Sequence, residues 1–182
     1  MSKYKPVLVL GSNSFAGSNF IKKLIHLNYN VIGVSRRNEI NDVFLGYKNS
    51  TKFKKKFSFK KIDINKNLNK LVNLIIQKKP SIIINFMAQG MVEQSWFSPE
   101  DWYNTNLVSQ SRLINKIYKF KFIKKYINFS TPEVYGNIKN WQKEKFDFTP
   151  TTPYAISRAA FDLHLKEMNK VFKFPIILTR AA

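Results

Sequence analysis

The chain has 182 residues, carries a formal net charge of +20, contains no cysteine, and is 44% hydrophobic and 15% aromatic. This composition indicates one well-cored globular domain, and the lack of cysteine excludes disulfides, thiolate zinc sites and cysteine nucleophiles. Because the N-terminus shows no secretory signal and no apolar run is long enough to cross a bilayer, we expect a cytoplasmic protein without a membrane partner.

The positive charge allows two interpretations. Basic surfaces attract phosphate backbones, so a protein that binds nucleic acid or another anionic surface is one alternative. The densest basic patch, residues 52–61, interleaves lysines with phenylalanines. These phenylalanines also fit the buried face of a strand entered from a solvated loop, which is the interpretation we favour. The lysine excess then reflects codon bias, and we expect no specific nucleic-acid partner.

Short apolar runs alternate with longer helical patterns, which is typical of βαβ units and a parallel sheet. The pattern predicts strands over 7–10, 31–34, 57–62, 82–86, 126–129 and 176–178, and helices over 16–27, 68–78, 101–120 and 154–172. We therefore expect an α/β fold with a doubly wound, Rossmann-like parallel sheet and helices on both faces. Residues 1–182 would form one dinucleotide-binding domain that also carries the catalytic motifs, with no residues left for a second domain.

The first candidate site is the turn of residues 11–17, which follows the first expected strand and opens the first expected helix. Backbone amides at such a helix N-terminus point toward a pyrophosphate, and the helix dipole favours its charge. Gly11 permits the tight turn, and Gly17 allows close packing of helix on sheet. Ser14 replaces the middle glycine, so its hydroxyl bonds a phosphate or the backbone stays slightly farther away; Phe15 is a further cofactor candidate. The alternative is a helix-start glycine turn without a ligand.

The residues at the end of the second strand determine the preference for NAD or NADP in such folds. An acidic residue here would bond the ribose 2′-hydroxyl of NAD, whereas arginine accommodates the 2′-phosphate of NADP. The sequence places Ser35, Arg36 and Arg37 at this point, which favours NADP over NAD, with a solvated basic loop as the alternative. After the third strand, Asp63 can approach the adenine amine beside Ile64, or it can cap the turn before the next helix.

The catalytic candidates centre on Tyr154 and Arg158, whose spacing of four residues puts both side chains on one helix face. A cation there can stabilise a tyrosine phenolate that acts as base. Lysine is the usual partner in this chemistry; arginine also stays charged and can bond ribose hydroxyls, but it is bulkier and planar. Thr131 can hydrogen-bond the substrate oxygen that is oxidised, and Glu133 adds a carboxylate. A polar turn followed by a packed tyrosine is the alternative.

These motifs resemble those of the extended short-chain dehydrogenases that act on nucleotide sugars, the NAD(P)-dependent epimerase/dehydratase family. The segment 85–90 is similar to the family's N-x-A-A-Q segment, which implies that Ala88 and Gln89 pass under the nicotinamide ribose. Asn106 matches the helix asparagine that supports the active-site backbone. The resemblance implies a nucleotide-sugar substrate and allows a homodimer. It also implies a C-terminal substrate domain, so we expect this chain to be a fragment without it.

The order of Thr131 and Glu133 is more similar to 4,6-dehydratases than to 4-epimerases. In the mechanism that this implies, Tyr154 takes the proton of the C4 hydroxyl while hydride passes to the cofactor, and Glu133 then removes the C5 proton as water leaves from C6. Pro132 stands where dehydratases carry Asp or Ser, so a 4-epimerase and a cofactor-binding pseudoenzyme are alternatives. The two histidines lie in separate helical patterns, and we expect no metal site.

Overall fold

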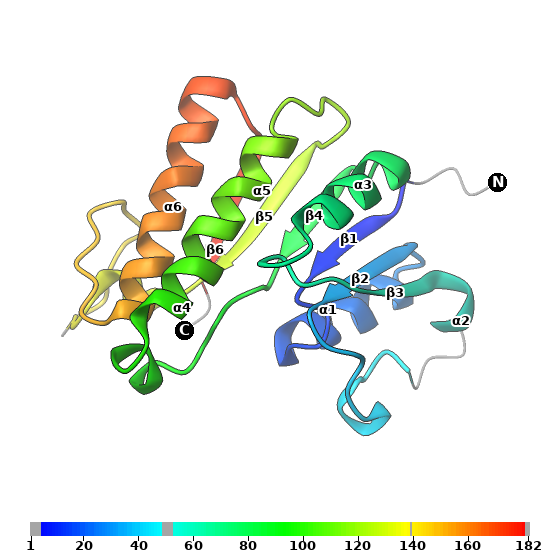
Figure 1. Ribbon diagram of the computed structural model, residues 1–182, viewed down its shortest axis with the longest axis horizontal. Coiled ribbons are helices and arrows are strands. Elements are labelled where there is room, and N and C mark those ends of the chain that lie inside the picture. Colours follow the sequence, from blue (N-terminus) through cyan, green and yellow to red (C-terminus); the bar gives the residue numbers. More distant parts are fainter. Residues whose placement is uncertain (1–4, 49–52, 139, 181–182) are drawn as a thin grey trace. The chain divides into compact units, whose positions relative to one another are not determined.

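The computed structural model describes residues 5–48, 53–138 and 140–180 (Figure 1). Contacts divide the chain into two compact units: unit 1 comprises Met1–Met87 and Phe120–Asn128, and unit 2 comprises Ala88–Lys119 and Phe129–Ala182. The strands form one six-stranded sheet in the order β3-β2-β1-β4-β5-β6. The expected Rossmann-like α/β fold is therefore confirmed.

Each expected strand is present, and its ends lie within two residues of the predicted ones. The strands are β1 (Val7–Leu10), β2 (Val31–Ser35), β3 (Phe57–Lys61), β4 (Ile82–Asn85), β5 (Lys125–Ser130) and β6 (Ile176–Arg180). The helices are α1 (Phe15–His26), α2 (Phe53–Lys56), α3 (Leu68–Lys78), α4 (Pro99–Tyr103), α5 (Ser109–Ile117) and α6 (Pro153–Phe172). Shorter turns are the 3-10 helices η1 (Asp42–Phe44), η2 (Glu93–Trp96) and η4 (Pro132–Tyr135), and the π-helical turn η3 (Asn104–Val108).

In unit 1, every residue of β1 is buried, so both faces of this strand are covered. Val7 and Val9 belong to a core cluster with Ile21 and Ile25 of α1. β1 pairs in parallel with β2 on one side and with β4 on the other, so the strand order reverses between β1 and β4. Open α/β sheets bind ligands at the carboxyl ends of the strands at such a reversal.

Two phenylalanines of the basic patch, Phe53 and Phe57, are partly buried and pack against the core of unit 1. Phe57 of β3 packs against the buried ring of Tyr47, with ring centroids 4.6 Å apart, while Ser58 and Lys60 are exposed. Phe53 lies in α2, a helical turn that the sequence pattern did not predict, and its ring is 5.5 Å from that of Phe57. In β3, partly buried phenylalanines alternate with exposed residues, which agrees with the interpretation as a strand face. Residues 49–52 lie outside the described part of the chain.

In unit 2, α6 is the longest helix. Thr152 caps its start by accepting a hydrogen bond from the amide of Ala155 at 3.1 Å, Pro153 occupies the first turn, and Lys173 ends the helix in a left-handed conformation. The expected single helix over 101–120 is divided into α4, η3 and α5. Within the residues that the structure describes, no helix is both long and apolar enough to cross a membrane.

Candidate active site

The turn after β1 belongs to unit 1 and requires both of its glycines. Gly11 has a φ of +80°, and a Cβ on it would lie 2.7 Å from the carbonyl carbon of Phe86. A Cβ on Gly17 would lie 2.4 Å from the carbonyl oxygen of Gly11. Gly11 thus permits the tight turn, as expected, whereas Gly17 makes its closest approach to the turn itself.

Ser14 closes this turn. Its Oγ accepts a hydrogen bond from the amide of Gly17 at 3.0 Å and donates one to the carbonyl of Gly11 at 2.8 Å, which makes it the N-cap of α1. The hydroxyl is therefore used within the turn, and its bond to a phosphate stays a prediction. Phe15 follows and is 87% exposed. The first amides of α1 have no acceptor within the helix, so the turn fits a pyrophosphate.

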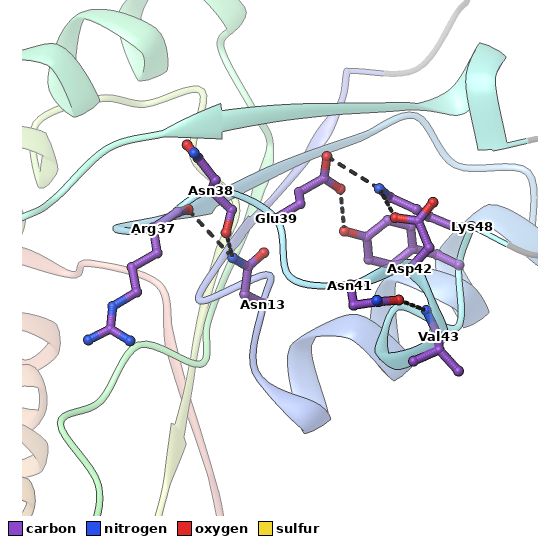
Figure 2. A network of polar contacts seen from close by, with 9 residues as sticks. Asn13, Arg37, Asn38, Glu39, Asn41, Asp42, Val43 and Lys48 are labelled. Atoms are coloured by element: carbon purple, nitrogen blue, oxygen red, sulfur yellow. Dashed lines mark hydrogen bonds and ion pairs between the residues drawn. The ribbon is translucent and has the colours of Figure 1, made fainter.

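The end of β2 combines a buried serine with two exposed arginines. The Ser35 hydroxyl accepts a hydrogen bond from the amide of Asn13 at 3.0 Å, and its Oγ lies 3.2 Å from the Oγ of Ser12. Ser35 therefore holds the glycine turn against β2. Arg36 and Arg37 are exposed, and Figure 2 shows the side chain of Arg37 extending away from Asn13. Positive charge that suits a phosphate is thus at the surface here.

Asp63 and Ile64 follow β3 in unit 1. The Asp63 carboxylate accepts a hydrogen bond from the amide of Asn65 at 2.9 Å, and the side chain of Ile64 is buried. Asp63 thus caps the turn before α3, which is one of the two roles expected for it. An approach of either residue to an adenine stays a prediction.

A chain of hydrogen bonds in unit 2 joins the segment after β4 to the start of α6. Asn106 is fully buried in η3; its Oδ1 accepts from the Gln89 amide at 2.7 Å and its Nδ2 donates to the Gln89 carbonyl at 3.0 Å. The same Nδ2 donates to the Ser157 hydroxyl at 3.0 Å, and that hydroxyl donates to the carbonyl of Tyr154 at 2.6 Å. Asn106 thus supports the backbone at Gln89 and Tyr154, while Ala88 is exposed.

Tyr154 is also held from its other side. Its amide donates a hydrogen bond to the hydroxyl of Ser95 at 3.1 Å, and Ser95 in turn donates to the carbonyl of Val92 at 2.5 Å. Both hydrogen-bonding groups of the Tyr154 backbone therefore contact buried serines, while its side chain is half-buried. Such fixed backbones keep a catalytic side chain in one position.

Thr131 and Glu133 follow β5, and Arg158 contacts the backbone of that strand, all within unit 2. Thr131 is the N-cap of η4, and its Oγ1 accepts from the Glu133 amide at 3.3 Å. Arg158 is 2% exposed, and its Nη2 donates to the carbonyl of Phe129. Burial raises the pKa of the Glu133 carboxyl above its ordinary value, as suits a group that takes up and returns a proton.

A buried ion pair that contacts the end of β5 was missed by the sequence analysis. Asp162 is fully buried on α6, and its Oδ2 accepts from the hydroxyl of Ser130 at 2.6 Å and from Nη2 of Arg180 at 2.9 Å. The Arg180 guanidinium lies 5.2 Å from the ring centroids of both Tyr135 and Phe148. The only sequence signal was the position of Asp162, one helical turn after Arg158. No cluster of metal-ligating side chains occurs among the described residues.

A parallel sheet with a positive-φ glycine turn after β1 and a tyrosine motif at the start of α6 is the arrangement of a dinucleotide-binding α/β protein. A family model described as GDP-mannose 4,6 dehydratase matches residues 8–181, and the chain belongs to this family.

The relatives that match this chain include proteins named as 4,6-dehydratases. The human dTDP-D-glucose 4,6-dehydratase is 28% identical over 182 residues, which cover 98% of this chain and 51% of the relative. The dTDP-glucose 4,6-dehydratase of Haemophilus influenzae is 24% identical, with 97% and 55% covered. The chain thus spans about half the length of the curated relatives it matches.

Solved structures agree on the fold. The dTDP-glucose 4,6-dehydratase DesIV of Streptomyces venezuelae, solved with NAD bound, has a TM-score of 0.82 at 23% identity, and the match covers 96% of this chain and 55% of that one. The UDP-glucose 4-epimerase of Thermotoga maritima, solved with UDP-glucose, has a TM-score of 0.81 at 24% identity and coverage of 96% and 54%. At these identities the two likenesses support the fold alone.

Proposed function

We propose that this chain supplies the cofactor-binding and acid–base residues for the NAD(P)-dependent 4,6-dehydration of a nucleoside-diphosphate hexose. The observation that carries the proposal is that Thr131 caps η4 and Glu133 lies within it, with the Glu133 carboxyl partly desolvated. Membership of the dehydratase family supports the same reaction. Because the relatives are about twice as long, we propose turnover for a form that carries the remaining half as well.

In the proposed reaction, Tyr154 takes the proton of the C4 hydroxyl and Thr131 donates a hydrogen bond to the developing C4 carbonyl. When bound, the nicotinamide cofactor would supply the acceptor for the C4 hydride and the donor of hydride to C6. Glu133 takes the proton from C5, which the C4 ketone acidifies, and gives it to the C6 hydroxyl, which leaves as water. Arg158 contributes the fixed positive charge one helical turn after Tyr154. The proton that Tyr154 took from the C4 hydroxyl balances the proton that is added to C5, so Tyr154 is restored and the product is the 4-keto-6-deoxy sugar.

Glu133→Gln tests the role of Glu133 as the base that takes the C5 proton. We expect turnover to fall by about 10²–10⁴-fold, because glutamine cannot take the C5 proton. Oxidation at C4 does not need this carboxylate, so reduced cofactor should accumulate on the protein and be visible by absorbance. Since the raised pKa keeps Glu133 protonated to a higher pH than an ordinary glutamate, dehydration should rise with pH through that raised pKa and be lost below it.

The control is Glu144→Gln, which makes the same change at an exposed residue and should leave turnover unchanged. Inversion at C4 without loss of water would favour the 4-epimerase alternative. Pro132 is the observation behind that alternative, because it occupies the position between Thr131 and Glu133 and cannot donate a proton. Cofactor binding without any reaction across a panel of nucleotide sugars would identify a pseudoenzyme.

We further propose NADP as the preferred cofactor, with NAD as the second. Exposed Arg36 and Arg37 after β2, and the absence of a carboxylate at Ser35, support this preference. Arg36→Ala should reduce the ratio of NADP to NAD affinity about tenfold, as expected for one lost hydrogen bond to a charged group. Calorimetric titration with both cofactors measures the ratio, and Arg112→Ala, at an exposed arginine of α5, is the control. Tighter binding of NAD that Arg36→Ala leaves unchanged would contradict the preference.

The remaining expectations belong to the same proposal. Residues 1–182 would be the dinucleotide-binding part of the protein, which would act in the cytoplasm on a nucleotide-sugar substrate. The proposed function is compatible with a homodimer. The lysine-rich surface would bind nucleic acid only non-specifically and lose it with salt.

A further inference from the structure

Asn13 joins the glycine turn to the segment that carries the two arginines. Its Nδ2 donates a hydrogen bond to the carbonyl of Asn38 at 2.8 Å and lies 3.5 Å from the carbonyl of Arg37, as Figure 2 shows. Its backbone amide donates to the Ser35 hydroxyl at 3.0 Å. One residue of the phosphate-binding turn therefore contacts both sides of the Arg36–Arg37 pair. All of these contacts lie within unit 1.

The orientation of the Asn13 amide follows from its neighbours. Only the NH₂ group can donate to two carbonyl oxygens, so Nδ2 must face Arg37 and Asn38 and Oδ1 must face away. Oδ1 is buried and has no hydrogen-bond partner among the described residues. The two hydrogen bonds that Nδ2 donates therefore fix the orientation of the amide, although Oδ1 is left without a partner in the part of the chain that the structure describes.

The far side of the segment is anchored independently. Glu39 accepts a hydrogen bond from the hydroxyl of Tyr47 at 2.7 Å, and the Tyr47 ring is fully buried. The Nζ of Lys48 lies 2.5 Å from Oδ1 of Asp42 and 3.9 Å from Oε2 of Glu39 (Figure 2). The backbone of the two arginines is thus fixed between Asn13 on one side and this Glu39 network on the other.

We propose that Asn13 is a specificity-positioning residue: by bonding the carbonyls after Arg36, it holds both arginines at the phosphate-binding turn and so sets the preference for a nucleotide with a 2′-phosphate. The inference rests on the proposed cofactor preference and deepens it. Ordering a loop and its side chains when a ligand binds costs free energy. Because the backbone of the two arginines is already fixed, only their side chains are left to be ordered when they bind a phosphate. The effect of Asn13 on specificity therefore comes without any contact between its side chain and the 2′-phosphate.

The test uses 2′,5′-ADP and 5′-AMP, which contain only the adenosine halves of NADP and NAD, titrated into the 182-residue chain. The wild-type chain should bind 2′,5′-ADP more tightly, and Asn13→Ala should reduce this preference about five- to tenfold. Asn13→Asp keeps the side-chain shape but cannot donate, so it should act in the same direction. Asn38→Ala is the matched control, because the carbonyl that Asn13 contacts belongs to the backbone and is retained.

Backbone order provides a readout that does not depend on the cofactor. Amide ¹⁵N order parameters for residues 36–41 should be near 0.85 in the free wild-type chain, as in rigid backbone, and should fall toward about 0.6 in Asn13→Ala. Wild-type values already below about 0.6, or values unchanged in both Asn13 variants, would overturn the inference. A wild-type chain that does not prefer 2′,5′-ADP would instead refute the cofactor preference and with it the specificity role. If Asn13→Ala lowers the affinity for 2′,5′-ADP and for 5′-AMP equally and leaves the order parameters unchanged, Asn13 only contacts the ligand. That result would also overturn the inference.

Discussion

Tyr154→Phe is expected to lower turnover of a nucleoside-diphosphate hexose by about 10²–10⁴-fold while leaving cofactor affinity nearly unchanged. The substitution removes only the phenolic hydroxyl that would take the proton of the C4 hydroxyl, and the aromatic ring is retained. The hydrogen bonds that hold Tyr154 come from its backbone amide and carbonyl, to Ser95 and Ser157, and phenylalanine retains both. A loss of rate in this variant would therefore report on chemistry rather than on a displaced helix.

The measurement is steady-state turnover in the longest form of the chain that its gene encodes, with a parallel calorimetric titration of the cofactor. Tyr118→Phe is the control, since it removes the same hydroxyl from a tyrosine at the end of α5 whose ring packs 4.8 Å from that of Phe172. It should change neither quantity. Turnover in Tyr154→Phe within a few-fold of wild type would eliminate Tyr154 as the base, and with it the proposed mechanism.

The elements that the sequence predicted well are those whose signals are local. β1 is four consecutive apolar residues, and all four are buried. α6 has a threonine cap and a proline in its first turn, so its start is encoded within a few residues. The single helix expected over 101–120 was predicted less well, because its apolar periodicity does not encode the π-helical turn at 104–108. That turn carries the buried Asn106, which suits the general association of π turns with functional sites.

The candidate site divides in the same way. Gly11 was predicted because a tight turn between strand and helix demands a residue that tolerates positive φ, and its φ is +80°. Asn13, Ser95 and Ser157 were missed, although each holds a candidate residue in place. Asn13 contacts a segment 25 residues away, and Ser95 contacts Tyr154 over 59 residues. Partners so far apart in the sequence become visible only when the chain is folded, whereas the residues they support recur in short motifs.

Asp162→Ala is expected to lower the free energy of unfolding by about 3–5 kcal/mol, because it removes one partner of a buried ion pair. Asp162 is fully buried, and the Arg180 side chain is only 11% exposed. Without the carboxylate, the Arg180 guanidinium would stay buried beside the Tyr135 and Phe148 rings, and the Ser130 hydroxyl would lose its acceptor. Urea denaturation of the 182-residue chain, followed by circular dichroism, measures the change.

Asp147→Ala is the matched control, since it breaks a Lys145–Asp147 pair whose side chains are 44% and 76% exposed, and it should cost less than about 1 kcal/mol. A double variant, Asp162→Leu with Arg180→Met, should recover part of the loss, because it removes both buried charges together. Equal costs for Asp162→Ala and Asp147→Ala would show that the buried pair contributes no more than a surface pair. A large cost would instead support the buried pair as a stabilising contact of unit 2, together with the hydrogen bond from Ser130, which directly precedes the η4 cap Thr131.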